Sequence, residues 1–214
     1  MIGDRIVAKP HHVKAAKAIF EALKSTVPGV RTAITIAGES GSGKSEIASE
    51  LAKCFESAGT RTIILQQDDY FFYPPKTNHE MRVKDINHVG TGEVNLELLD
   101  EHLQGFKKSP WETIIKPLVI FDEDAITEED LDPAAFELAI AEGTYTTLLK
   151  NADHRVFIDR NYEDTLKDRM ERKRDIIDDF TNNILKIEHD IISKHKTLAS
   201  IIVKRDYSIT VLKT

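Results

Sequence analysis

The segment Gly38-Glu39-Ser40-Gly41-Ser42-Gly43-Lys44-Ser45 matches the pattern G-x-x-x-x-G-K-[ST] at every fixed position. Glycines in such a loop let backbone N–H groups turn inward around phosphate oxygens, and the helix that follows contributes its partially positive end. Lys44 brings a charge to the β- and γ-phosphates, and the Ser45 hydroxyl is suited to ligate Mg²⁺. The motif therefore predicts a site for ATP and Mg²⁺ formed by this loop and the next residue, Glu46.

Apolar patterning around the loop favours strands that alternate with helices. Residues 32–37 form a β-rich run before the loop, and Ile47, Leu51, Cys54 and Phe55 give the following helix an inward face. Further strands are predicted over 61–65, 111–121, 136–141, 156–158, 201–203 and 207–212, and helices over 13–23, 96–106 and 163–195. We expect residues 66–91 to be irregular and residues 122–132 to form an acidic loop. This order predicts an α/β fold with three layers and a central parallel sheet, in one domain over 1–214.

Composition excludes several classes of protein. Lys and Arg total 29 against 36 for Asp and Glu, a formal charge of −7, which argues against a nucleic-acid-binding protein. The N-terminus lacks the apolar region of a signal peptide, and the longest apolar runs are far too short to cross a bilayer. A single cysteine, Cys54, fits a reducing compartment. We therefore expect a cytoplasmic protein with a small-molecule partner and no membrane or nucleic-acid partner, and we leave oligomerisation open.

Two carboxylates follow the predicted strand over 61–65. Asp68 and Asp69 would lie near the phosphate loop, because ligands of α/β sheets bind beyond the carboxyl ends of the strands. One of them could accept a proton from a hydroxyl that attacks the γ-phosphorus, or could hold Mg²⁺ through water. Asp68 is the preferred candidate for the base and Asp69 is the alternative.

Four sequence blocks together resemble the uridine kinase/phosphoribulokinase family of P-loop small-molecule kinases. These are the phosphate loop, the block from Gln67 to Phe71, Glu142-Gly143 after the strand over 136–141, and Phe157-Ile158-Asp159 followed by Leu166, Arg169 and Arg172. The resemblance implies a kinase that phosphorylates a hydroxyl of a small molecule, a nucleoside or a related sugar-bearing metabolite. It implies that Asp68 is the catalytic base, that Ser45, Asp68 and Glu142 serve Mg²⁺, and that Arg169 and Arg172 close on the phosphates from a mobile helical lid near residues 162–178.

Two segments of the acceptor region depart from the uridine kinase pattern. Asn87-His88-Val89-Gly90 lacks the proline of the Asp-His-Pro block, and Pro117 is followed by Leu118-Val119-Ile120-Phe121 rather than by Tyr-Asp-Phe. These departures argue against uridine itself as the acceptor.

An alternative interpretation comes from the residues just after Phe121. The run Leu118 to Glu123 resembles a Walker B strand, in which Asp122 would bind Mg²⁺ and Glu123 would activate water. The protein would then be a P-loop ATPase or a nucleotide-binding regulator without an acceptor.

Overall fold

A six-stranded sheet forms the centre of the computed structural model, which describes residues 1–3, 6–27, 29–109, 112–172 and 178–212. Its strand order is β2-β5-β1-β6-β7-β8, and all neighbouring strands are parallel except β7 and β8, which are antiparallel. A separate antiparallel pair is formed by β3 and β4. The strands are β1 (Thr32–Gly38), β2 (Thr62–Gln66), β3 (Ile114–Ile120), β4 (Ala125–Leu131), β5 (Leu138–Glu142), β6 (His154–Ile158), β7 (Ile201–Val203) and β8 (Ile209–Val211).

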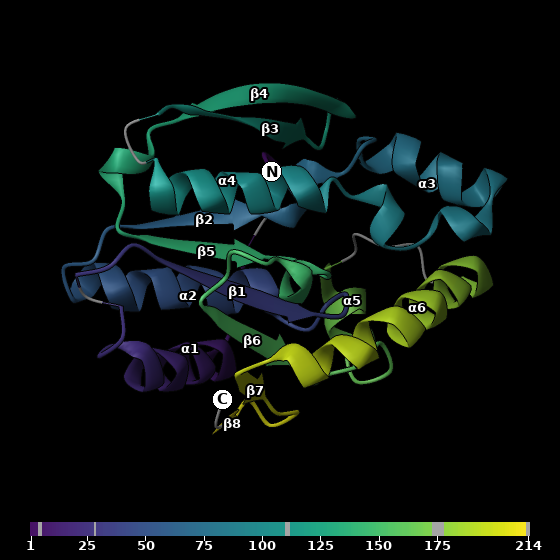
Figure 1. Cartoon of the computed structure of the whole chain (residues 1–214). Coiled ribbons are helices and arrows are strands. Elements are labelled where there is room, and N and C mark those ends of the chain that lie inside the picture. The colour runs from purple at the N-terminus through teal and green to yellow at the C-terminus, as the bar shows by residue number, and fades with distance from the viewer. Residues whose placement is uncertain (4–5, 28, 110–111, 173–177, 213–214) are drawn as a thin grey trace.

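Helices cover both faces of the sheet. The α-helices are α1 (Pro10–Leu23), α2 (Lys44–Ser57), α3 (Pro75–Lys84), α4 (Leu96–Lys108), α5 (Leu166–Arg172) and α6 (Asp179–Ile192). Figure 1 shows α1 and α2 on one face and α4 on the other, with α3 and α6 beyond the arrow ends of the strands. The predicted three-layer α/β fold with a mostly parallel central sheet is confirmed.

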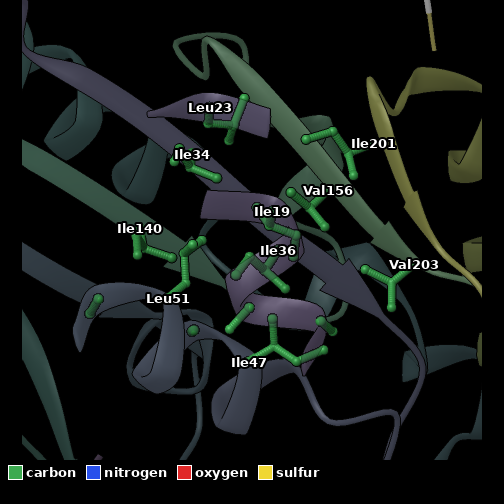
Figure 2. Packing of buried hydrophobic residues seen from close by; sticks show 14 of the residues in the cluster. Ile19, Leu23, Ile34, Ile36, Ile47, Leu51, Ile140, Val156, Ile201 and Val203 are labelled. Atoms are coloured by element: carbon green, nitrogen blue, oxygen red, sulfur yellow. The ribbon is translucent and has the colours of Figure 1, made fainter. Parts of the chain in front are cut away.

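The central strand β1 is buried along its whole length, so its two faces carry separate cores. Ile34 and Ile36 pack with Ile19 of α1 and Leu51 of α2, as Figure 2 shows. On the opposite face, Ala33 and Ala37 belong to the core that includes α4. This alternation is the period of two that a strand imposes on its side chains.

Several predicted elements are wrong. The predicted acidic loop over 122–132 contains strand β4, which pairs with β3 from Ile114↔Leu131 to Ile120↔Ala125. The region 66–91, predicted to be irregular, contains α3. The predicted helix over 163–195 is divided into α5, α6 and a 3₁₀ segment over Ser193–Leu198, and residues 173–177 lie outside the described part. Charged, exposed strands and polar helices lack an apolar periodicity, which explains why the pattern missed them.

Strand register brings the candidate site residues to one edge of the sheet. Ile36 of β1 and Gln66 of β2 are both paired with Glu142 at the end of β5. The loop after β1, the carboxylates after β2 and the carboxylate that ends β5 are therefore neighbours. Among the described residues, no helix is long and apolar enough to cross a membrane.

Candidate active site

The phosphate loop joins β1 to α2 and requires glycine at two positions. Gly41 and Gly43 have φ angles of 73° and 97°, in the left-handed region that favours glycine. A Cβ atom at Gly41 would lie 2.6 Å from Cγ of Arg169, and one at Gly43 would lie 2.8 Å from Nε2 of His12. The loop is thus enclosed by α1 on one side and by α5 on another, and a side chain at either position would displace one of them.

Three side chains at the start of α2 and the end of β5 form the polar part of the loop. The Lys44 ammonium donates to the backbone oxygen of Glu39 at 3.0 Å. The Ser45 hydroxyl donates to Oε1 of Glu142 at 3.0 Å. Burial, and then the charge of Asp68, raise the pKa of Glu142 to about 7. Burial and a neighbouring negative charge thus disfavour the ionised form of Glu142, and a bound cation would stabilise that form.

These oxygen ligands fit Mg²⁺. A hydroxyl and carboxylates are hard ligands of the kind that Mg²⁺ prefers, and Mg²⁺ commonly takes one or two protein carboxylates together with substrate phosphates and water. Within the described ranges, no group of three or more His, Cys, Asp or Glu side chains is arranged to hold a metal by itself. Ser45 and Glu142 are therefore suited to supply part of the ligand set, alongside phosphate oxygens and water.

The two carboxylates after β2 have different environments. Asp68 is exposed and lines the cavity that also contains Lys44 and Ser45. Asp69 is 2% exposed, and its oxygens bind the Lys116 ammonium at 3.1 Å and the Val119 backbone N–H at 3.0 Å. It also pairs with the amino group of Met1 at 2.9 Å. Asp69 therefore anchors the β3/β4 hairpin, and only Asp68 is free to face a substrate.

A cavity of about 630 Å³ connects the phosphate loop with α3 and α6. Ser40, Gly41, Lys44 and Ser45 line it from the loop, and Asp68 and Glu142 line it from the strand ends. Among the other loop residues, Glu39 lines a second cavity of about 240 Å³, whereas Gly38, Ser42, Gly43 and Glu46 line neither of the two. Glu46 is buried in the first turn of α2.

Arg169 is directed into the first cavity from α5. It is 2% exposed, its Nη2 donates to the backbone oxygen of Tyr162 at 3.0 Å, and its Nε and Nη1 have no hydrogen-bond partner among the described residues. A buried guanidinium with two unused donors is strongly disfavoured unless an anion binds it. The side chain of Arg172 lies outside the described residues, as does the region from 173 to 177 within the predicted lid.

One contact of the phosphate loop was missed by sequence reasoning. The buried Glu39 carboxylate accepts a hydrogen bond from the Tyr162 backbone N–H at 2.7 Å and contacts Nδ1 of His189 at 2.6 Å. The loop is thereby tied to the segment before α5 and to α6. No local pattern could have indicated this contact, because His189 lies 150 residues further along the chain.

Asp122 and Glu123 do not occupy a Walker B position. Both are exposed in the turn between β3 and β4, and β3 pairs only with β4 within the described strands. The strand beside β1 that ends in an acidic residue is β5, and its residue is Glu142. The alternative interpretation was therefore wrong about this strand.

Comparisons with known proteins identify the family of this chain. A model of the phosphoribulokinase/uridine kinase family matches residues 33–197. The chain belongs to this family. A uridine kinase from Clostridium novyi (strain NT) is 30% identical over 79% of this chain and 85% of its own length. The bifunctional alpha-galactosidase/sucrose kinase AgaSK from Mediterraneibacter gnavus is 25% identical over 92% of this chain, which spans only 23% of that protein.

Solved structures show the same fold at low identity. A D-glycerate 3-kinase from Cryptococcus neoformans var. grubii superposes with a TM-score of 0.61 at 11% identity, covering 92% of this chain and 96% of that one. Membership of the phosphoribulokinase/uridine kinase family makes the chain an ATP-dependent phosphotransferase that acts on a small molecule.

Proposed function

We propose that this kinase transfers the γ-phosphoryl group of ATP to a hydroxyl of a nucleoside or a related sugar-bearing metabolite. The observation that carries the proposal is the shared cavity, in which the exposed Asp68 faces the same space as Lys44 and Arg169. Two relatives, a uridine kinase and a bifunctional alpha-galactosidase/sucrose kinase, are also named for sugar-bearing acceptors. The departures around Asn87 and Pro117 favour an acceptor other than uridine.

In the proposed reaction, Asp68 accepts the proton of the acceptor hydroxyl while the hydroxyl oxygen bonds to the γ-phosphorus and ADP leaves. Lys44 and Arg169 neutralise charge on the transferred group, and Arg172 would add to them from the same helix. Ser45, Glu142 and Asp68 would hold Mg²⁺, which supplies further charge neutralisation when bound. Closure of a lid over residues 162–178 would exclude water, which otherwise competes with the acceptor.

The test measures ADP release from Mg-ATP with nucleosides, ribosides and free sugars as acceptors. We expect ADP release to depend on an acceptor and to fall by about 10²-fold or more in Asp68→Asn, because a general base contributes that much to the rate. Asp122→Asn is the matched control and should behave like the parent protein, since Asp122 lies in an exposed turn. Acceptor-independent ADP release that persists in Asp68→Asn would instead indicate an ATPase.

A further inference from the structure

The far part of the main cavity is formed by α3 and α6, which lie together beyond the strand ends (Figure 1). Arg82 of α3 joins the two helices, because its Nη2 donates to Oε1 of Glu188 on α6 at 3.1 Å. The same guanidinium binds both carboxylate oxygens of Glu93, through Nε and through Nη2, the latter at 2.9 Å. Glu93 is fully buried behind Arg82, which itself lines the cavity.

Arg82 would be expected to bind an anionic acceptor, but its guanidinium is already engaged by carboxylates of the protein. Arginine recognises phosphates and carboxylates with two parallel donors, and here those donors are occupied by Glu93. Asn78 reinforces the arrangement by donating to Oε1 of Glu93 at 2.9 Å. Lys76 also lines the cavity, but it is exposed at the start of α3. Among the described residues of α3 and α6 that line the cavity, no buried cation is therefore left unpaired for an acceptor. The unpaired donors of Arg169 lie on α5, where the proposed function uses them for the transferred phosphoryl group.

Glu188 instead offers an unused hydrogen-bonding oxygen. Its Oε1 is held by Arg82, whereas Oε2 takes no hydrogen bond from any residue that the structure describes. Burial raises the pKa of Glu188, and the neighbouring Arg82 opposes this rise. In either protonation state the carboxyl group can hydrogen-bond a hydroxyl, and in neither state does it attract an anion.

The remaining lining suits a sugar ring. Phe71, Tyr73 and Phe121 line the same cavity and can cover the apolar face of a ring. Asp68 and Glu80 add carboxylates to this part of the lining. Aromatic faces beside carboxylates complement a molecule that has many hydroxyl groups and no charge of its own.

We propose that the acceptor is an uncharged polyhydroxylated molecule, and that Glu188 selects it by accepting a hydrogen bond from a hydroxyl that is not phosphorylated. The proposal rests on the proposed kinase function and narrows it, because it excludes sugar phosphates and sugar acids as acceptors. It also assigns a role in acceptor specificity to α6, which follows the predicted lid in the sequence.

Uncharged and anionic acceptors, with fructose and fructose 6-phosphate as a matched pair, test the charge of the substrate. ADP release from Mg-ATP is measured with uridine, fructose and sucrose, and with fructose 6-phosphate and D-glycerate. We expect saturable turnover with an uncharged compound and none with the anionic ones. Turnover that is confined to an anionic compound would overturn the inference and leave the kinase function intact. Absence of acceptor-dependent ADP release with both classes would count against the proposed function, and the inference would fall with it.

A variant of Glu188 tests whether this residue contributes to binding of the acceptor. Glu188→Gln should raise the KM of the uncharged acceptor by up to about tenfold, the value of one hydrogen bond, with kcat and the KM of ATP little changed. Asp190→Asn is the matched control, since it removes a carboxylate of the same helix that is exposed. A Glu188→Gln variant that lowers the unfolding midpoint and shifts both KM values alike would show a structural role and refute the proposed one.

Discussion

Asp68 and Asp69 are adjacent in the sequence, but Asp69 is buried and Asp68 is exposed, so their side chains contact different parts of the protein. The backbone turns through a 3₁₀ segment (Gln67–Tyr70), which directs Asp69 towards Lys116 and leaves Asp68 at the cavity. Sequence reasoning could place both carboxylates after β2, but it could not choose between them on local grounds. The choice depends on the β3/β4 hairpin, which is about 50 residues away and supplies the partners of Asp69.

This difference at the residue scale has a measurable consequence. Asp69→Asn should lower the free energy of unfolding by about 2 kcal/mol, because Lys116 and the Val119 N–H lose a buried charged partner. Asp68→Asn should change it by less than about 0.5 kcal/mol, since Asp68 is exposed. Urea unfolding of both variants measures the two values. Equal losses of stability would contradict the assignment of separate roles.

At the scale of elements, α3 and β4 show how a segment without an apolar pattern can still be ordered. Helix α3 buries only Asn78, and its first turn is capped by a residue from the β3/β4 turn. Asp124 accepts hydrogen bonds from the backbone N–H groups of Lys76 at 2.6 Å and Thr77 at 3.2 Å. Both elements were missed by periodicity because neither depends on an amphipathic face. Helix α3 is held by Asp124 and Glu93, and β4 is held by its pairing with β3.

Removal of this cap should loosen α3 specifically. Asp124→Gly should cost about 1 kcal/mol, typical of a lost helix cap, and glycine tolerates the φ angle of 49° at this position. Amide hydrogen exchange over 75–84 should become faster, while exchange in α4 stays as in the parent protein. Asp122→Gly, an exposed position in the same turn, serves as the control. Unchanged exchange in α3 would show that the cap does not hold the helix.

At the scale of the whole molecule, distant segments meet around the phosphate loop. Residues 1–32 precede the match to the family model, yet Lys9 binds Asp168 of α5 at 2.9 Å and His12 packs against Gly43. Arg160 also binds Asp168, at 3.0 Å, and contacts Tyr207. The position of Arg169 on α5 therefore depends on both the first and the last elements of the chain.

The stability of the whole fold should depend on pH through a buried histidine. His102 of α4 hydrogen-bonds the hydroxyl of Tyr70 at 2.9 Å, and burial, followed by the charge of Lys116, lowers its pKa to about 4. The unfolded chain takes up this proton near pH 6.5 and the folded chain does not, so stability is lost as the pH falls from about 6.5 to 4. The loss should approach about 3 kcal/mol.

His102→Gln removes the titrating group and keeps a hydrogen-bonding side chain. Urea unfolding between pH 4 and pH 8 should therefore give a flatter curve for this variant than for the parent protein. Carboxylates titrate in the same range in both proteins, so the difference between the two curves is the quantity of interest. Parallel curves would show that His102 is not the source of the pH dependence.

Local sequence patterns were enough to predict the phosphate loop and the strands and helices that have an apolar period. They also carried the family resemblance, which the match over 33–197 confirms. These features depend on spacing along the chain, where glycine freedom and side-chain periodicity act directly. Three features became visible only when the chain was folded. Asp69 binds Lys116, Asp122 and Glu123 lie in an exposed turn, and Arg82 is neutralised by Glu93 and Glu188. Burial and ion pairing depend on which distant segments come into contact. The spacing of residues within one segment does not indicate those contacts.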